Sequence, residues 1–374
     1  MKSKSLDIHI QLYKNLRLNN NNKYTQLLKN ELGIKNLNNS IFSTAEHIAP
    51  FNTINTVSFL LPQLLLQHFN KVEKKDVIIL GGSLVSLDNI DYPRGFYEIS
   101  NSKKAFNLFP QKARKNAVLL TDIVKFEDIK DKHNFFDKYD FLRKNFMKTY
   151  QNFAYQQSEI MEKIIKEWLF NSGKIIVKPL EQVAKNILIK LLENDDKSIK
   201  LLFKNIEIFK RDTYNVFCSW NETKGTFLFW EVTNKKLNKI NFNDNIFKGK
   251  NISFGLDFKE ILILLKNNKI LPSVSLSLFI VSWLPNIPIA GGHKQYWYWQ
   301  YMIESFDNIF QTKSKKKLSQ FGYNKLNFQD LNILSKYGTG LELVINNIDK
   351  NKLFDEVFNL LIYKSNEKDG YYES

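Results

Sequence analysis

Apolar residues form a few short continuous runs that are separated by polar stretches. The clearest run covers Val77 to Leu80 and ends in Gly81-Gly82-Ser83. A continuous apolar run of this length is typical of a strand buried on both faces in a parallel sheet. Two similar runs, at 117–123 (A-V-L-L-T-D-I) and 174–180 (K-I-I-V-K-P-L), predict further strands, with Asp122 near the end of the first.

Other segments place apolar residues at helical spacing. Residues 24–32 predict a short helix that Gly33 ends, and residues 181–193 predict an amphipathic helix. A longer helical stretch is predicted at 135–171, and a short apolar helix at 257–266. Three acidic residues lie at and just after the end of the helix predicted at 181–193. They are Glu193, Asp195 and Asp196, and we expect them in a solvated turn.

Residues 212–233 alternate between apolar and polar positions. This alternation predicts a β-hairpin with Gly225 in its turn. Cys218 lies in the first expected strand, where a core position is favoured over a nucleophile. Glu231 at the end of the second strand suggests a metal nuclease. Thr233 stands where such a site has a lysine, which disfavours that interpretation.

Together these patterns predict an α/β fold. We expect a Rossmann-like parallel sheet core with a long helical segment and an added β-hairpin. The expected division is an N-terminal arm at 1–40, the core at 41–134 and 172–310, the helical segment at 135–171, and a helical C-terminal part at 311–374. A chain of 374 residues is long enough to bury such a core.

The formal net charge of +16 changes this picture little. Of the 54 basic residues only five are arginines, and asparagine is also abundant, as an AT-rich coding sequence would give. Proteins that read phosphates or bases usually rely more on arginine, so a nucleic-acid partner is less favoured than a small-molecule substrate. The single cysteine excludes an internal disulfide framework and a cysteine zinc site, and we expect no metal.

A membrane location is also disfavoured. The N-terminus has no apolar core typical of a signal peptide. The most apolar segment, Val274 to Leu284, is too short to span a bilayer and is bounded by Pro272 and Pro285. We therefore expect a cytoplasmic protein without a membrane partner; the oligomeric state is not indicated.

Ligands bind open α/β sheets outside the carboxyl ends of the strands, which makes Gly81, Gly82 and Ser83 a candidate substrate loop. A simple turn is the alternative. Shortly after it, Pro93 and Gly95 flank Arg94 in a turn. Arg94 could clamp a carboxylate or another anion, with Asp88 in the same site. Alternatively it forms a surface salt bridge to Asp88 or Asp91.

A second candidate site lies between Ile270 and Phe306. There Gly291 and Gly292 precede a dense aromatic helix, whose first-turn N–H groups can bind an anion. His293, Gln295 and Tyr296 belong to the start of this helix. A capping or surface role is the alternative for His293, and core packing is the alternative for the neighbouring tryptophans.

Three pieces of the chain carry a resemblance to a known family. I-L-P followed by A-G-G-H-K-Q-Y-W-Y-W-Q resembles the Leu-Pro…Gly-Gly-x-x-x-x-Tyr-Trp stretch of the bacillithiol-biosynthesis cysteine-adding enzymes. S-T-A-E-H at 43–47 and V-I-I-L-G-G-S at 77–83 are similar in order and spacing to two further pieces of that family. About a third of the chain is covered. Thr44-Ala45-Glu46-His47 replaces the family's Thr-Gly-Gln-Gln. The matched positions are Pro272, Gly291, Gly292, Tyr296 and Trp297.

The resemblance implies a Rossmann-like core with a related pocket and a ligase- or transferase-like biosynthetic reaction. We expect an enzyme that acts on a small polar substrate, anionic and sugar- or nucleotide-like, and condenses it with an amino acid or amine. His47 or His293 would serve as general acid/base, and Glu46 would orient a histidine or a substrate amine. No cofactor is identified, although a nucleotide is a candidate. The alternatives are an interaction protein that uses the aromatic helix at 293–303, and a nucleic-acid-binding or -processing protein.

Overall fold

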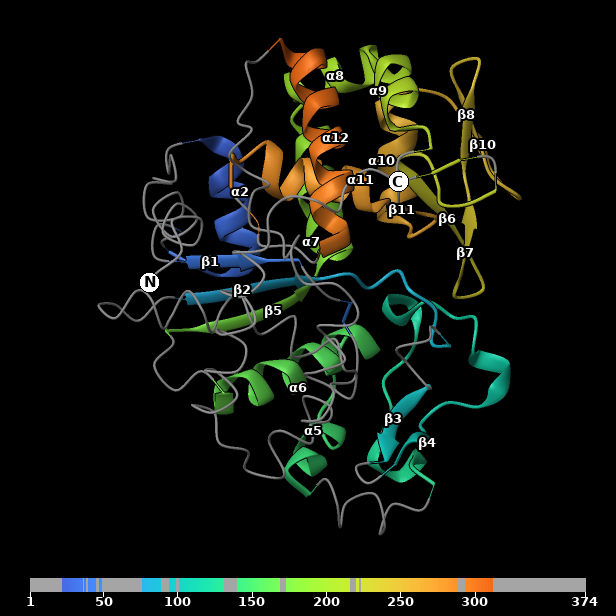
Figure 1. Cartoon of the computed structure of the whole chain (residues 1–374). Coiled ribbons are helices and arrows are strands. Elements are labelled where there is room, and N and C mark those ends of the chain that lie inside the picture. The colour runs from blue at the N-terminus through green and yellow to red at the C-terminus, as the bar shows by residue number, and fades with distance from the viewer. Residues whose placement is uncertain are drawn as a thin grey trace, which may run out of the picture.

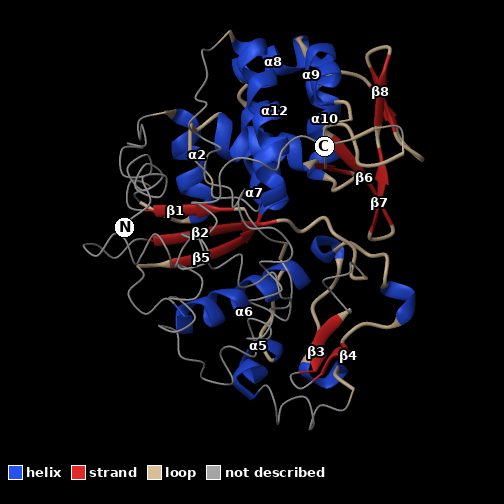
Figure 2. Ribbon diagram, in the orientation of Figure 1, coloured by secondary structure: helices blue, strands red, loops and turns tan. Residues whose placement is uncertain are grey.

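The computed structural model has a mixed α/β architecture (Figures 1 and 2). It describes residues 22–35, 37, 40–44, 47–48, 76–88, 94–98, 101–130, 140–168, 173–215, 220–221, 223–287, 289 and 293–311. The N-terminal half of the expected arm, residues 1–21, and the expected C-terminal part after residue 311 lie outside these ranges.

Three parallel strands form the first layer. They are β1 (Ser40–Ser43), β2 (Asp76–Gly81) and β5 (Ile175–Pro179), in the order β1-β2-β5. Ile78 in the central strand pairs with Phe42 on one side and Ile176 on the other. Val77 to Leu80 are fully buried. The prediction of a strand buried on both faces in a parallel sheet is therefore confirmed, as is the strand at 174–180.

Helices cover both faces of this sheet (Figure 1). α2 (Lys23–Leu32) and α7 (Leu180–Glu193) lie on one face. α6 (Phe153–Trp168), with the short α5 (Arg143–Phe146) beside it, lies on the other. The helix predicted at 181–193 is confirmed. The helical stretch predicted at 135–171 is confirmed in part, since η4 (Asp140–Leu142), α5 and α6 lie in it, but it is interrupted between Phe146 and Phe153.

The helix predicted at 24–32 is also confirmed, and it begins one residue earlier. Asn22 caps its N-terminus by accepting from the Tyr24 N–H, and Gly33 ends it in the left-handed conformation with φ +67°. Leu28 is fully buried. The Asn22 amide also donates to the Leu284 carbonyl at 3.0 Å. This part of the expected arm thus belongs to the core.

The second half of the chain adds helices and short antiparallel strands around an aromatic core. The helices are α8 (Lys197–Lys204), α9 (Ile206–Thr213), α10 (Phe258–Lys266), α11 (Val274–Leu278) with a π-helical turn at Phe279–Trp283, and α12 (His293–Phe310). The strands form two sheets, β11 (Ile270–Pro272)–β6 (Phe229–Thr233)–β7 (Lys236–Lys239) and β10 (Ser253–Phe254)–β9 (Ile246–Lys248)–β8 (Asn241–Asn243). The helix predicted at 257–266 is confirmed as α10, with Asp257 as its N-cap.

A hairpin is present in this half, although not where the alternation placed it. β6 and β7 are joined by Asn234 and Lys235, with φ of 49° and 64°. Two consecutive residues with positive φ make the tight turn that matches the twist of paired strands. Around Gly225 the described residues form isolated bridges, between Tyr214 and Trp220 and between Trp220 and Gly225. Cys218 lies outside the described residues.

Two further local predictions are wrong. The apolar run at 117–123 forms a 3-10 turn, η2 (Val118–Leu120), rather than a strand. Asp196 is not part of a solvated turn, because it is buried. It caps α8 through the N–H groups of Ser198 and Ile199 and pairs with Lys23 of α2. The cap and the ion pair with Lys23, which is distant in the sequence, therefore compensate for the burial of Asp196.

The remaining described elements connect β2 to α6. The strands β3 (Gly95–Glu98) and β4 (Asn101–Asn107) pair antiparallel, and three further 3-10 turns lie at η1 (Gln111–Ala113), η3 (Phe126–Asp128) and η4 (Asp140–Leu142). Among the described residues, no helix is both long enough and apolar enough to cross a membrane.

Candidate functional site

The carboxyl ends of the three parallel strands bring together residues from three distant parts of the chain. His47 follows β1, Gly82 and Ser83 follow β2, and Glu181 follows β5 in the first turn of α7. His47 and Gly82 form a parallel bridge, and the Ile48 N–H donates to the Gly82 carbonyl at 2.8 Å. This is the edge at which open α/β sheets bind ligands. We call these four residues the strand-end cluster.

Glu181 is held by Ser83. Its Oε2 accepts from the Ser83 N–H at 2.8 Å and from the Ser83 hydroxyl at 2.7 Å. Both residues are buried, with Glu181 only 4% exposed. The contact exists because α7 begins directly after β5, so its first turn faces the loop that leaves the neighbouring strand β2.

Burial gives Glu181 a distinct proton affinity. Removal from water raises the pKa of this carboxyl group above its usual 4.5, although the hydrogen bonds from Ser83 and from the Leu84 N–H work in the opposite direction. The net rise favours the protonated acid. A buried carboxyl with a raised pKa is the kind of group that enzymes use to donate a proton near neutral pH.

Gly82 separates this carboxyl group from the His47 ring. A methyl group on Gly82 would lie 3.1 Å from His47 Cδ2 and 3.8 Å from Glu181 Oε1. These two atoms are therefore no more than about 7 Å apart, a gap that one small substrate group or one water can bridge. Any larger residue at position 82 would occupy the space between an imidazole and a carboxyl group.

The segment around η2 closes one side of the strand-end cluster. The Leu119 N–H donates to the Ser83 carbonyl at 3.0 Å, and the Val118 N–H donates to the Val85 carbonyl at 2.9 Å. On its other side the Thr121 carbonyl accepts from the Phe153 N–H at the start of α6. The segment at 117–123, which was predicted as a strand, thus connects the loop after β2 to α6 through hydrogen bonds. Asp122, expected at the sheet edge, is instead exposed and paired with Lys235.

Asp88 and Arg94 lie between β2 and β3 in the sequence. Asp88 accepts from the Ser86 hydroxyl at 2.9 Å and pairs with Lys115 at 3.1 Å. Partial burial opposes ionisation of Asp88, yet the Ser86 hydrogen bond and the Lys115 charge together lower its pKa.

Arg94 fastens a turn. Its φ is +57°, its Nη1 donates to the Phe109 carbonyl at 3.0 Å, and its own carbonyl accepts from the Leu108 N–H at 2.9 Å. The described hydrogen bonds of Arg94 are thus made to backbone groups, and the expected salt bridge to Asp88 is not among its described contacts. Asp91, the other expected partner, lies outside the described residues.

The structure brings together one part of the predicted site. His47, Gly81, Gly82 and Ser83 meet at the sheet edge, with Gly81 packed against buried Ile48. Other predicted residues are not described: Glu46, Gly291 and Gly292 in full, and the side chains of His293, Gln295 and Tyr296.

A helix does begin at His293, as the Gly291-Gly292 pair predicts. In Figure 1 the N-terminal end of α12 is the end drawn towards the parallel sheet.

Glu181 was not among the residues that the sequence singled out. A signal for it existed, because it follows the strand at 174–180 directly and therefore had to lie at the ligand-binding edge. Within the described ranges, no group of three or more His, Cys, Asp or Glu side chains is placed to hold a metal ion. Comparison of the chain with protein-family models and with curated protein sequences gave no match.

Proposed function

We propose that this protein is an enzyme that binds a small polar substrate at the strand-end cluster, with Glu181 and His47 as an acid/base pair. The observation that carries the proposal is the buried Glu181 carboxyl, held by Ser83 and separated from His47 only by Gly82. A proton donor and a proton acceptor on two sides of a glycine are what a proton-transfer site requires.

The reaction class that fits is a condensation. His47 would take the proton from an attacking amine or hydroxyl group, whose lone pair forms the new bond to an electrophilic carbon of the second substrate. The Glu181 carboxyl would give its proton to the group that leaves that carbon. Ser83 is a positioning residue in this scheme, because it touches Glu181 through both its N–H and its hydroxyl.

The same proposal includes three expectations from the sequence, which concern the type of core, the class of substrate and the role of His293. The parallel strands with helices on both faces support a Rossmann-like core, in which the substrate lies at the carboxyl edge. The resemblance to the cysteine-adding enzymes supports a sugar-like substrate that is condensed with an amino acid or amine. His293 and the start of α12 would then supply a second group to the site, with a small-molecule substrate as the partner.

Untargeted mass spectrometry can test the proposal without knowledge of the substrate. The protein is incubated with a cell metabolite extract supplemented with sugar phosphates, nucleotides and amino acids. Wild type is compared with His47→Gln and Glu181→Gln. We expect wild type to consume two small molecules and to form one larger product, and both variants to lower that rate by on the order of a hundredfold or more.

Glu162→Gln is the matched control. Glu162 is also a partly buried glutamate whose pKa is raised by burial, but it lies on α6 and accepts from the Val177 N–H at 2.9 Å. We expect it to retain the wild-type rate. A reaction that survives both His47→Gln and Glu181→Gln, or that Glu162→Gln abolishes equally, would refute the assignment.

A further inference from the structure

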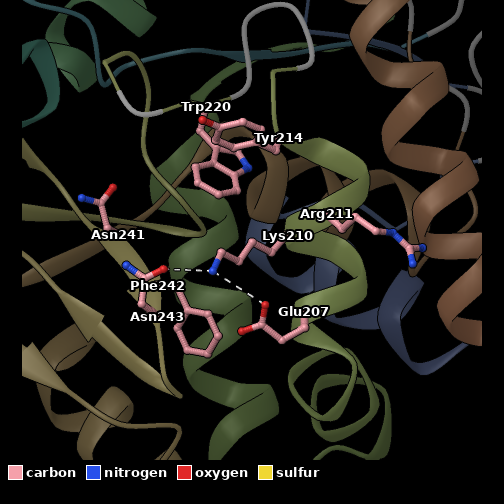
Figure 3. A pocket seen from close by; sticks show the side chains of 8 residues that line it. All are labelled: Glu207, Lys210, Arg211, Tyr214, Trp220, Asn241, Phe242 and Asn243. Atoms are coloured by element: carbon pink, nitrogen blue, oxygen red, sulfur yellow. Dashed lines mark hydrogen bonds and ion pairs between the residues drawn. The ribbon is translucent and has the colours of Figure 1, made fainter.

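A separate pocket lies between α9 and β8, in the second half of the molecule (Figure 3). Its volume is about 520 Å³, which is within the usual range for small-molecule sites. Side chains from α9 and from the bridge around Trp220 form one side, and the strand β8 forms the other. None of the residues of the strand-end cluster lines it.

One wall of this pocket is aromatic and fixed. Trp220 is only 7% exposed, and its Nε1 donates to the Thr213 hydroxyl at 3.0 Å. Tyr214 meets Trp220 edge to face, with ring centroids 5.1 Å apart, and is itself 38% exposed. Phe242 is buried beneath β8. Tyr214 is therefore the ring that a ligand would contact, and Trp220 holds it in place.

The charges in the pocket are balanced in pairs. Lys210 lies 3.7 Å from the Glu207 carboxylate and donates to Asn243 Oδ1 at 3.0 Å (Figure 3). Arg211 pairs with Asp212 at 2.9 Å, and Figure 3 shows its side chain directed away from Lys210. A phosphate would therefore have to approach Glu207 to reach Lys210. In a chain with a net charge of +16, this local balance disfavours an anionic ligand.

The polar groups of the pocket both donate and accept hydrogen bonds. Asn241 and Asn243 are two residues apart on β8, so their carboxamides project on the same face, and both are exposed. Glu207 adds an acceptor and Lys210 adds a donor. A hydroxyl group also both donates and accepts hydrogen bonds. Neighbouring hydroxyls on one sugar ring can therefore bond to these four side chains.

We propose that this pocket binds a neutral saccharide unit. The apolar C–H face of the sugar ring would pack on Tyr214, and its hydroxyls would bond to Asn241, Asn243 and the Lys210–Glu207 pair. A neutral polyol satisfies the amides without disturbing the ion pairs, whereas a charged ligand leaves one of the paired groups uncompensated. The inference is independent of the acid/base reaction proposed for the strand-end cluster.

Thermal unfolding and tryptophan fluorescence test this inference on the full chain. The probes are glucose, galactose, N-acetylglucosamine and maltose, with adenosine and adenosine monophosphate as competing classes. We expect at least one saccharide to raise the Tm in a saturable manner. Tyr214→Ala and Asn243→Ala should each weaken that binding by about tenfold, the effect of one lost stacking or hydrogen-bonding contact.

Tyr301→Ala is the matched control, because Tyr301 is an exposed tyrosine on α12 that does not line the pocket. It should bind the saccharide as wild type does, and so should His47→Gln. The Tm of each variant without ligand shows that it folds. The saccharide inference fails if no saccharide shifts the Tm, if only adenosine or its monophosphate does, or if Tyr214→Ala binds as tightly as Tyr301→Ala.

Discussion

Two buried glutamates occupy the two halves of this molecule, and they are held in different ways. Glu231 lies on β6, the central strand of the β11-β6-β7 sheet, and is 1% exposed. Its Oε1 accepts from the Asn251 side chain at 2.7 Å and from the Thr233 hydroxyl at 3.1 Å. Further donors are the backbone N–H groups of Lys250 and Asn251. Glu231 thus fastens the turn after β9 to β6.

Glu181 is held by the loop after β2 instead. The N–H and the hydroxyl of Ser83 donate to Oε2, the Leu84 N–H also bonds to this carboxyl group, and a methyl group on Gly82 would lie 3.8 Å from Oε1. Burial alone therefore does not distinguish the two carboxyl groups. Their neighbours differ, since Glu181 lies across Gly82 from His47, whereas Glu231 is bonded by Thr233, Lys250 and Asn251.

The largest expected effect is the loss of Glu231. Glu231→Ala should lower the free energy of unfolding by about 3 kcal/mol, because it removes a buried carboxyl group that accepts from the N–H groups of Lys250 and Asn251. Equilibrium unfolding in urea measures this. Glu231→Gln, which keeps one acceptor oxygen, should cost less. A loss below about 1 kcal/mol for the alanine variant would remove the structural role.

A smaller effect is expected from alanine substitutions of Gly81 and Gly82, two adjacent glycines at the end of β2. A methyl group on Gly81 would lie 2.4 Å from buried Ile48, whereas one on Gly82 meets the edge of the His47 ring at 3.1 Å. Gly81→Ala should therefore destabilise the protein by about 2 kcal/mol, and Gly82→Ala by less than about 1 kcal/mol. Of the two, only Gly82→Ala should abolish substrate consumption while the Tm stays close to wild type. Equal destabilisation by both would show that position 82 is also a packing site.

Ser83→Ala should have a still smaller effect on stability, about 1 kcal/mol, since it removes the hydroxyl bond to Glu181 and keeps the N–H bond. It also removes a group that lowers the pKa of Glu181, so that pKa should rise further. If Ser83 positions the acid, the alkaline limb of the pH–rate profile, which follows loss of the Glu181 proton, shifts to higher pH with this variant. Ser86→Ala, which alters a serine bonded to Asp88 outside the cluster, should leave the profile unchanged.

The smallest expected effect is a pH dependence of stability. Burial raises the pKa of Glu181 above 4.5, the value for the unfolded chain, so the folded state binds its proton more tightly. Its contribution to stability is complete below pH 4.5 and is lost as the pH rises through the folded pKa. Relative to Glu181→Gln, which stays neutral, wild type should therefore lose stability above pH 4.5. Parallel stability curves for the two proteins would contradict the raised pKa.

Local signals in the sequence predicted several elements correctly. The run Val77 to Leu80, the helix that Gly33 ends and the helix that Asp257 caps each depend on residues within one segment. The run at 117–123 shows the limit of such signals. Ala117, Val118 and Leu119 are buried as the residues of a strand would be, but the Leu119 N–H bonds to the Ser83 carbonyl instead of to a neighbouring strand.

The candidate site was likewise predictable only in part. The sequence indicated Gly81, Gly82 and Ser83 because they follow an expected strand, and His47 because it lies in a piece that carries the family resemblance and can titrate near neutrality. It did not indicate Glu181, which is 98 residues from Ser83. Helical periodicity places Glu181 at the start of an amphipathic helix without saying what lies opposite. The aromatic pocket with Tyr214 and Asn243 was missed for the same reason, since its sides come from α9 and β8.

The sequence by itself therefore determined where several strands and helices of this protein form and where some of them end. Only the tertiary structure decided that Glu231 stabilises a turn whereas Glu181 lies near a histidine. It also decided that Asp196 is buried as the N-cap of α8 and not solvated. The physical reason is the separation along the chain over which each kind of interaction acts. Capping and periodicity act over a few residues, whereas burial, proton affinity and charge balance depend on partners that only the fold brings close.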